Sequence, residues 1–376
     1  MQITVKRDDI SEVLSRIQGL TGKKTSLAIT ENVLLKTNEN GVTLSATDLE
    51  TGFEGVYPAN VETFGEIAIN ARKFTEIVKN FPTNDISIQE LENRWIEISS
   101  EKVEYHIVGM DPEEFPHIPK VDNLGFVMVD SAAFRKMIEK SVAIGVAGNE
   151  KRVHMLGALL TFLNKQDGHK LVRMVSTDLK RLSKADSRLD PETDLADGLS
   201  GAGVIVPKKG LTEISKFLES GGNVEIGIKD NHFIVKKENE YAIVNLLEGA
   251  FPPYEDVLAV DPEYDIVFDR HQLQMMLKRM TILTSEDYRG VIFHFNDNEF
   301  TIRTVNAMLG ESRETMDIAY AGEPKEIAFN PRYFLEAIGF MSQDNVLLNI
   351  RDDKNPCIVR GENDEDYINL IMPMKI

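Results

Sequence analysis

The sequence predicts an α+β fold built from one repeated unit. Three observations support this: an apolar pattern that occurs six times, strand-like alternation after each copy, and helix-start residues at each junction. In each copy two apolar residues lie two positions apart, and an apolar series with spacing i, i+3, i+4, i+7 begins five residues later. Period-2 spacing puts side chains on one face of a strand, whereas the later series forms one stripe along a helix.

The six copies begin at residues 3, 67, 127, 204, 266 and 327. The first copy consists of Ile3 and Val5, followed by Ile10, Val13, Leu14 and Ile17. Two later copies carry serine within the helical series, Ser141 in the third and Ser215 in the fourth. One unit used six times accounts for the whole length of the chain.

Residues typical of helix starts lie at the junctions between strand and helix. Asp and Ser cap the free amides of a first turn, and proline is tolerated there because its missing N–H is not needed. We therefore expect strand, short turn and helix in every copy. The junction residues are Asp8, Asp9, Asp130, Ser131, Pro207, Asp269 and Pro331.

Strand signals fill the remainder of each unit. In the first copy, Asn40-Gly41 separates two alternating apolar runs and predicts a hairpin. Residues 53–57 form a further candidate strand. Each unit should contain one helix and about four strands, mostly antiparallel, with one helix face buried on a sheet.

Proline-containing stretches follow every second unit, at residues 115–119, 251–254 and 372–374. This spacing predicts three similar domains of two units each. We place them at residues 1–122, 126–253 and 254–376, which are ordinary domain lengths.

Composition narrows the class of protein. The chain has 376 residues, of which 42% are apolar, and Cys357 is its single cysteine. An internal disulfide is thereby excluded, which suits a reducing compartment. Residues 1–7 lack the apolar core of a signal peptide, and no apolar run is long enough to span a membrane. We expect a cytoplasmic protein with no membrane partner.

The net charge of −19 at first argues against nucleic acid, but its distribution argues otherwise. The six expected helix segments together carry +7, which leaves −26 on the rest of the chain. If the helices share one surface, that surface is positive on an acidic body. The alternative is that these charges only fill solvated helix faces.

Motifs of catalysis and metal binding are absent from the sequence. The seven histidines form no i, i+4 pair and have no neighbouring cysteine, and no nucleophile elbow or phosphate-binding loop is present. Asp364-Glu365-Asp366 is interpreted as a solvated turn. We therefore expect neither a cofactor nor a metal, and a scaffold or binding ring rather than an enzyme.

Several segments, taken in order with the repeat, resemble one family. They are Ile3-Thr4-Val5-Lys6-Arg7, Ala71-Arg72-Lys73-Phe74, Ser176-Thr177-Asp178 with Arg181-Leu182, Phe251-Pro252-Pro253-Tyr254 with Val257-Leu258, and Met372-Pro373-Met374-Lys375-Ile376. With these segments the chain resembles the bacterial DNA sliding clamp family, the β subunit of DNA polymerase III, over its whole length.

The resemblance implies a head-to-tail homodimer in the DNA clamp fold, a ring with helices inside and sheets outside. Such a ring encircles duplex DNA without reading its sequence and confers processivity without being an enzyme. The implied partners are the DNA polymerase III α subunit, the clamp loader and other proteins that carry a clamp-binding motif.

The resemblance also implies roles for individual residues. Lys24, Arg72, Asn149 and His154 would contact DNA, although Arg152-Val153-His154-Met155 departs from an aromatic pair found in some members. Ile282 and Leu283 would lie at the dimer interface. A hydrophobic groove between the second and third domains would bind partner peptides through Met155, Thr177, Arg181, Leu182, Pro252, Val257, Leu370, Met372 and Met374.

Within this groove, Arg181 is expected at the rim, where it could bond a peptide carbonyl. Leu370, Met372 and Met374 alternate and should project to one side of a last strand, and methionine adapts to varied ligands. Leu179 replaces a small residue common in the family and should reshape one wall. The alternative for this segment is an ordinary terminal core strand.

Two other functions stay open. A cytosolic acidic enzyme on repeated α+β domains would show a cluster of catalytic residues unique to one repeat, and the sequence shows none. A protein-only scaffold would use the same groove without meeting DNA, and the positive helices argue against it.

Overall fold

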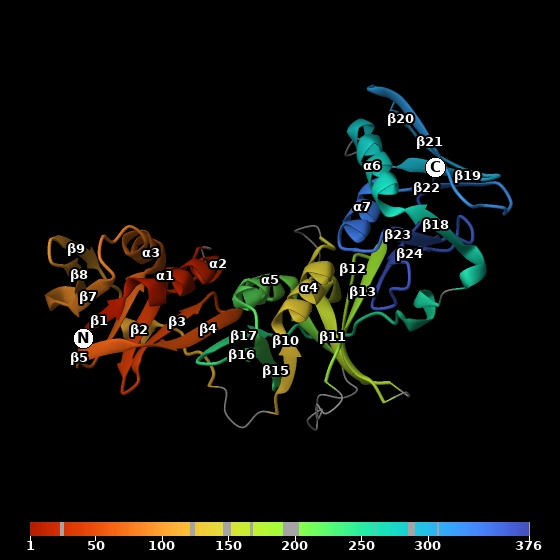
Figure 1. Cartoon of the computed structure of the whole chain (residues 1–376). Helices are drawn as coiled ribbons and strands as arrows, with labels where there is room; N and C mark the ends of the chain where they lie inside the picture. Colours follow the sequence, from red (N-terminus) through yellow and green to blue (C-terminus); the bar gives the residue numbers. More distant parts are fainter. Residues whose placement is uncertain are drawn as a thin grey trace. The chain divides into compact units, whose positions relative to one another are not determined.

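The computed structural model describes residues 1–22, 26–120, 125–145, 152–165, 168–190, 203–259, 261–284, 290–306 and 308–375. These residues form two compact units, drawn in Figure 1. Unit 1 is built mainly from Met1–Arg135 and Val206–Leu247, and unit 2 mainly from Lys136–Arg188 and Glu248–Ile376.

Unit 1 contains a five-stranded and an eight-stranded sheet. The first sheet has the order β5 (Ala59–Thr63), β1 (Gln2–Lys6), β7 (Asp85–Glu90), β8 (Trp95–Ser100) and β9 (Val103–Val108). The second has the order β10 (Val127–Asp130), β15 (Asn223–Lys229), β16 (His232–Lys237), β17 (Glu240–Asn245), β4 (Thr51–Tyr57), β3 (Gly41–Thr47), β2 (Asn32–Asn38) and β6 (Glu66–Asn70).

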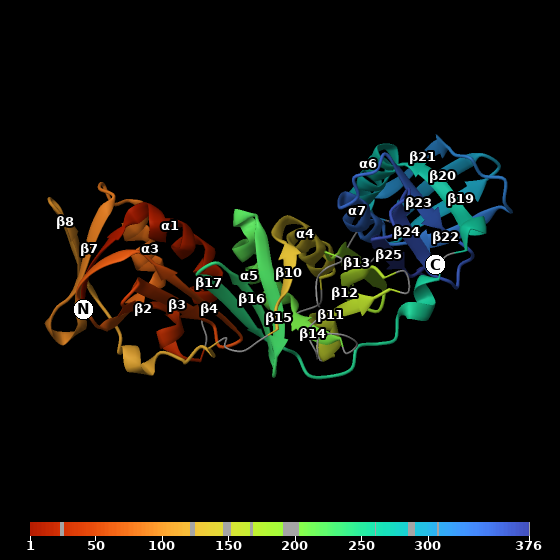
Figure 2. The ribbon, with the colours of Figure 1, turned by 60° about the horizontal axis from the view of Figure 1, so that its bottom comes forward.

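Helices cover these sheets. They are α1 (Arg7–Arg16), α2 (Gln18–Thr21), α3 (Ala71–Lys79) and α5 (Lys208–Phe217). α1 packs against α3, which in turn lies on β2 and β6, while α5 lies on β17. The paired α1 and α3 are visible in Figures 1 and 2.

Unit 2 repeats this plan with an eight-stranded and a four-stranded sheet. The eight-stranded sheet has the order β14 (Val204–Pro207), β11 (Gly157–Asn164), β12 (Lys170–Thr177), β13 (Arg181–Arg188), β25 (Tyr367–Ile371), β24 (Cys357–Gly361), β23 (Asn345–Asn349) and β18 (Asp265–Asp269). The four-stranded sheet has the order β21 (Gly310–Asp317), β20 (Glu299–Asn306), β19 (Val291–Asn296) and β22 (Lys325–Phe329). Its helices α6 (Arg270–Met280) and α7 (Pro331–Gly339) pack on each other, and α4 (Ser131–Val142) crosses the boundary between the units.

All six predicted strand–helix copies are present: β1–α1, β6–α3, β10–α4, β14–α5, β18–α6 and β22–α7. Among their pattern positions only Val204 and Ser215 are half-buried, and the others are buried. Ser141 is satisfied in its buried position because its hydroxyl donates to the Met137 carbonyl at 3.0 Å. The expected α+β class, with antiparallel strands, is confirmed.

The predicted short turn between strand and helix is wrong in most copies. Lys6 ends β1 and Arg7 begins α1, so one residue changes the backbone from extended to helical. Asp269 caps α6 through the Gln272 amide, and Pro331 occupies the first turn of α7, as predicted. Asp8 and Asp9 instead lie inside the first turn of α1, where carboxylates still favour the positive end of a helix. Pro207 precedes α5 rather than opening it.

Two strand pairings join segments that the sequence assigned to different domains. β17 pairs with β4 in unit 1, and β13 pairs with β25 in unit 2. Each pairing turns two four-stranded halves into one continuous sheet. The compact units consequently follow the sheets rather than the boundaries at residues 122 and 253, and those boundaries stay a prediction.

The predicted hairpin at Asn40-Gly41 is confirmed, with Asn38 opposite Gly41 and a φ of 133° at Gly41. No helix among the described residues is long and apolar enough to cross a membrane.

Cys357 provides a test of the packing of unit 2. It lies on β24 opposite Ile371, is 1% exposed, and burial raises the pKa of its thiol. We expect thiol alkylation in the native protein to be at least about a hundredfold slower than in guanidinium, because a local opening of about 3 kcal/mol must come first. Timed quenching with mass spectrometry measures this. Equal rates in both conditions would contradict the buried position.

Candidate partner groove and nucleic-acid surface

A tight hairpin between β12 and β13 forms one side of the candidate groove. The Thr177 hydroxyl donates to the Arg181 carbonyl at 2.8 Å and accepts from the Leu179 amide at 3.0 Å. Asp178 Oδ1 accepts from the amides of Lys180 and Arg181. These local bonds hold Leu179 in the left-handed region, with φ 66°, and leave its side chain exposed. Such bonds from Thr and Asp side chains are typical of turns.

The C-terminal segment forms the opposite side. β25 pairs antiparallel with β13, which places Leu370 opposite Leu182. Beyond β25, the Met372 amide donates to the Lys180 carbonyl and the Met374 amide to the Ala328 carbonyl, both at 2.8 Å. The side chains of Met372 and Met374 are exposed. The segment is thus held by backbone bonds and offers its methionines to solvent.

The floor of the groove is an apolar cluster of Val175, Leu182, Tyr254 and Leu370, with Leu159, Phe251 and Leu258 packed against it. The predicted groove residues separate into two groups. Met155, Thr177, Leu182 and Leu370 are buried, and two of them, Leu182 and Leu370, belong to the floor. Val257, Met372 and Met374 are exposed, and Pro252 is half-buried.

A charged network lies beside the floor on the same face of the sheet, because Arg173 is two residues from Val175 and Lys184 two residues from Leu182. Arg173 makes a bidentate pair with Asp186 at 2.8 and 2.9 Å and hydrogen-bonds Tyr254. Lys184 adds a 3.0 Å ion pair to Asp186 and donates to the Glu365 carbonyl at 2.7 Å. Burial raises the pKa of Tyr254, and the hydrogen bond with Arg173 offsets part of that shift. The network fixes Tyr254, and with it the segment that carries Pro252 and Val257.

A cavity of about 300 Å³ opens beside the methionines. It is lined by Lys180, Asn330, Tyr333, Met372, Pro373, Met374 and Lys375. This volume accommodates a few side chains of an extended peptide. Lys180 and Lys375 are both exposed at its margin, and neither makes an ion pair within the described residues.

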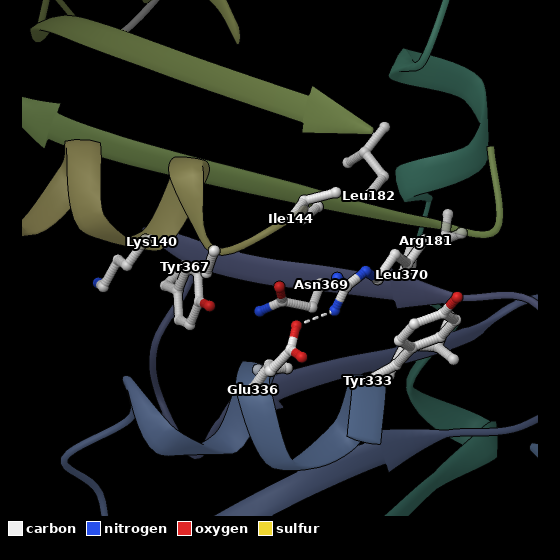
Figure 3. Close-up of a pocket in the computed structure, with 12 residues that line it drawn as sticks. Lys140, Ile144, Arg181, Leu182, Tyr333, Glu336, Tyr367, Asn369 and Leu370 are labelled. Atoms are coloured by element: carbon white, nitrogen blue, oxygen red, sulfur yellow. Dashed lines mark hydrogen bonds and ion pairs between the residues drawn. The ribbon is translucent and has the colours of Figure 1, made fainter. Parts of the chain in front are cut away.

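Arg181 corrects one prediction. It is 8% exposed rather than at the rim, and it forms ion pairs with Asp178 and Glu336. Its guanidinium also lies 4.2 Å from the centre of the Tyr333 ring. Figure 3 shows Arg181 directed towards Glu336 of α7, in a small second cavity shared with Ile144. Alternate residues of β13 face opposite sides of the sheet, so Arg181 points to the face opposite the one that carries Leu182.

Three domain profiles of one family match the chain in order. The N-terminal domain of the DNA polymerase III beta subunit matches residues 1–119, its central domain residues 128–253, and its C-terminal domain residues 256–375. The chain belongs to the DNA polymerase III beta subunit family. It therefore has the three-domain clamp fold of that family.

Individual members of the family match over their full lengths. The beta sliding clamp of Chlamydia pneumoniae is 28% identical over 376 residues, covering 100% of this chain and 99% of that protein. The beta sliding clamp of Vibrio cholerae is 28% identical, and the match covers 100% of this chain and 100% of that protein. The crystal structure of the DNA polymerase III subunit beta from Pseudomonas aeruginosa is similar with a TM-score of 0.90, at 26% identity and full coverage of both chains.

In this clamp family member, Arg72 is the predicted DNA residue that the structure describes most clearly. It is the second residue of α3, its side chain is 84% exposed, and it shares Glu76 with Lys73 at 3.1 and 3.2 Å. Hydrogen bonds from Lys73 and Arg72 lower the pKa of Glu76. Two cations and one carboxylate give the N-terminal end of α3 a net positive charge, which has the same sign as the helix dipole at that end.

The other predicted DNA residues have different outcomes. Lys24 and Asn149 lie outside the described residues. His154 is half-buried and its ring meets Phe251 edge-to-face at 6.4 Å, with Nε2 buried. This places His154 against the wall of the groove and does not favour a phosphate contact, which stays a prediction.

The predicted interface residues lie directly after α6. Ile282 is 73% exposed, whereas Leu283 is half-buried and its carbonyl accepts from the Asn306 side chain at 3.1 Å. Val305 on β20 is exposed, as are Met308 and Leu309 in the turn between β20 and β21.

Sequence reasoning missed Lys180, Asn330, Tyr333 and Lys375 as cavity residues. Asn330 is visible in sequence only as a helix cap, which it is for α7. Its place in the cavity depends on the bond between Met374 and Ala328, which joins the chain end to β22. No local sequence pattern predicts such a contact between distant segments.

Proposed function

We propose that this chain acts as a replicative sliding clamp, a closed ring around duplex DNA that tethers the polymerase and other DNA-processing proteins in the cytoplasm. The observation that carries the proposal is the in-order match of all three family domains over nearly the whole chain. The ring itself carries out no chemistry. Its partners would include the polymerase, the clamp loader and other proteins with a clamp-binding peptide.

The charge distribution supports the DNA part of the proposal. The six repeat helices, as the structure bounds them, carry a net charge of +8, which leaves −27 on the remainder of the chain. DNA repels an acidic body and is attracted to a positive helical surface, so binding is confined to that surface. Contacts to phosphates alone carry no sequence information, which suits a protein that must slide.

Closure of a ring by two copies is supported by two unpaired sheet edges. β9 ends the first sheet of unit 1, and β21 ends the last sheet of unit 2. Near the first edge, Trp95 on β8 and Tyr105 and Val108 on β9 are exposed. Near the second edge, Ile282 after α6 and Leu309 before β21 are exposed. An open edge with apolar side chains tends to pair with another strand. We infer that β9 of one copy pairs with β21 of a second copy, head to tail.

The groove supports the tethering part of the proposal. An extended peptide can set apolar side chains on the cluster that contains Leu182 and Leu370 and into the cavity beside Met372. Lys180 and Lys375 flank that cavity on an otherwise acidic chain. We infer that partner peptides carry an apolar anchor and a neighbouring carboxylate.

The first prediction concerns topology. When a clamp loader places the chain on a nicked circular duplex, we expect it to stay bound during gel filtration and to leave once the circle is cut. A ring is held by its closure rather than by affinity, so free ends release it. Persistent retention on linear DNA with open ends would contradict the ring.

A charge reversal tests the helical surface in the same assay. Arg72→Glu should reduce loading onto the circle and make loading less dependent on salt, since one phosphate contact is replaced by repulsion. Lys36→Glu is the matched control, because Lys36 also pairs with one exposed carboxylate but lies on strand β2. Equal effects of both variants would assign the change to net charge alone and would argue against a DNA contact of the helical surface at Arg72.

The second prediction concerns the dimer. Replacing Ile282 and Leu283 together by alanine should weaken the dimer at least about tenfold, because each buried aliphatic side chain contributes about 1.5–3 kcal/mol. Sedimentation equilibrium at micromolar concentration measures the mass. Val267→Ala, at an exposed apolar position on β18, should leave it unchanged. An unaltered mass for the double variant would place the interface elsewhere.

The third prediction concerns the groove. Met372→Ala should weaken binding of a fluorescent clamp-binding peptide about tenfold or more, because a methionine that becomes buried on binding contributes about 1.5–3 kcal/mol. Fluorescence anisotropy gives the Kd. Met275→Ala is a matched control, since both methionines are 37% exposed and Met275 lies on α6.

The inferred carboxylate is tested with two peptides that differ by Asp or Asn beside the anchor. Lys180→Ala should weaken the Asp peptide by up to about fivefold, the range of an exposed ion pair, and should hardly affect the Asn peptide. Equal loss for both would assign Lys180 to packing instead of charge recognition.

A further inference from the structure

Three side chains with metal-binding atoms meet on the hairpin of β8 and β9 in unit 1. Glu97, Glu104 and His106 each offer an oxygen or nitrogen, and these atoms all lie within 4.8 Å of one another. His106 Nε2 is 3.5 Å from a Glu97 oxygen, and His106 Nδ1 is 3.4 Å from a Glu104 oxygen. Within the described residues no other group of three such side chains occurs.

The strand register explains why these residues meet. Glu97 lies directly opposite His106, and Ser99 lies opposite Glu104. Glu104 and His106 are two residues apart and therefore share one face of β9. Ile96 and Ile98 are buried on the other face of β8, so Glu97 and Ser99 point outward. The Ser99 hydroxyl donates to Glu97 Oε1 at 2.8 Å and orients that carboxylate.

We propose that Glu97, Glu104 and His106 form a surface site for a divalent transition-metal ion, with Zn²⁺ as the best fit. One imidazole nitrogen and two carboxylate oxygens are a donor set that Zn²⁺ accepts at about 2.0–2.2 Å per bond. An ion binds only one nitrogen of the ring, and with one ligand atom per residue the three atoms lie within 4.8 Å of one another. Bonds of this length require about 3.4 Å between two ligands of a tetrahedral ion, so side-chain rotation has to bring the three atoms closer together. Mg²⁺ is disfavoured because it prefers oxygen ligands in an octahedral arrangement.

Another histidine of the chain shows what the site requires. His294 lies on β19 with one carboxylate, Glu326, at 3.7 Å, and Glu326 is already paired with Arg303 at 2.8 Å. A cation there would meet a guanidinium instead of a second carboxylate. His294, whose side chain is 37% exposed against 39% for His106, is therefore a control for metal binding by a histidine alone.

A bound ion would join the two strands of the hairpin on its outer face. The ligands lie on the face of the sheet, whereas the free hydrogen-bonding groups of β9 lie along its edge. Metal binding and edge pairing can thus occur together. The proposal does not depend on the clamp function, because it follows from the hairpin alone.

The chain carries its own probe for the ion. Trp95 is its single tryptophan, lies on β8 two residues before Glu97, and is 43% exposed. Residues two apart on a strand share a face, so Trp95 is next to the site. Ni²⁺ or Cu²⁺ bound there should quench its emission, and Zn²⁺ added afterwards should restore it by competition.

The experiment titrates the full chain with Ni²⁺ while tryptophan emission is recorded. We expect saturable quenching of the tryptophan emission. His106→Gln should lower the apparent affinity for Ni²⁺ by more than roughly tenfold, which is the loss expected when only an outer-shell partner of a metal ligand is removed. Glu97→Gln should also lower this affinity, whereas His294→Gln should leave it unchanged. Both site variants replace exposed or half-exposed side chains, and unaltered emission without metal confirms their fold.

Each of the following results would overturn the proposal. They are the absence of saturable quenching, quenching that His106→Gln leaves intact, and quenching that His294→Gln weakens equally. Retained affinity in Glu97→Gln would also reject the three-ligand site, because histidine alone would then account for binding.

Discussion

The antiparallel pairing of strands from different repeats is the constraint on which the rest of the structure depends. A unit of one helix and four strands leaves sheet edges whose amides and carbonyls need partners. β17 and β4 close one such pair of edges, and β13 and β25 close another. Each closure creates an eight-stranded sheet, and the helices follow because each is attached directly to a strand.

The two closures differ in the side chains that cover the sheet beside them. The hairpins before both junctions have one geometry: Leu49 and Leu179 are left-handed, and each donates its amide to a threonine hydroxyl two residues earlier. The difference comes at the paired position, where Gly52 faces Ile243 but Leu182 faces Leu370.

In unit 1 that position is filled by the chain itself. A side chain at Gly52 would meet Ile243 at 2.9 Å and Ile118 at 3.2 Å, so Ile118, from the proline-containing stretch 115–119, occupies the space. Ile118 belongs to an apolar cluster with Ile243. In unit 2 the corresponding floor is covered only in part, by Phe251 and Leu258, and exposed methionines continue it. A repeated backbone thus becomes asymmetric through a few side chains.

Sequence periodicity could predict the six copies because burial of a stripe and of a strand face is a local pattern. It placed Leu273 and Phe334 in the core, and it located the cap at Asp269. It could not predict the inward turn of Arg181, which depends on Glu336 and Tyr333 of a distant helix. The pairing of Glu97 with His106 could not be predicted for the same reason, because a search for i, i+4 spacing does not detect residues that lie opposite each other on two strands.

The pairing of cations on the helices bears on how a ring could move along DNA. Arg72 and Lys73 share Glu76, and Arg279 pairs with Glu314. Exposed pairs of this kind contribute only about 0–1 kcal/mol. A phosphate can therefore replace the carboxylate at small net gain and be released at small cost. The same number of lysines and arginines without carboxylate partners would bind each phosphate more tightly. We infer that these ion pairs allow the positive helical surface to attract DNA without binding it tightly.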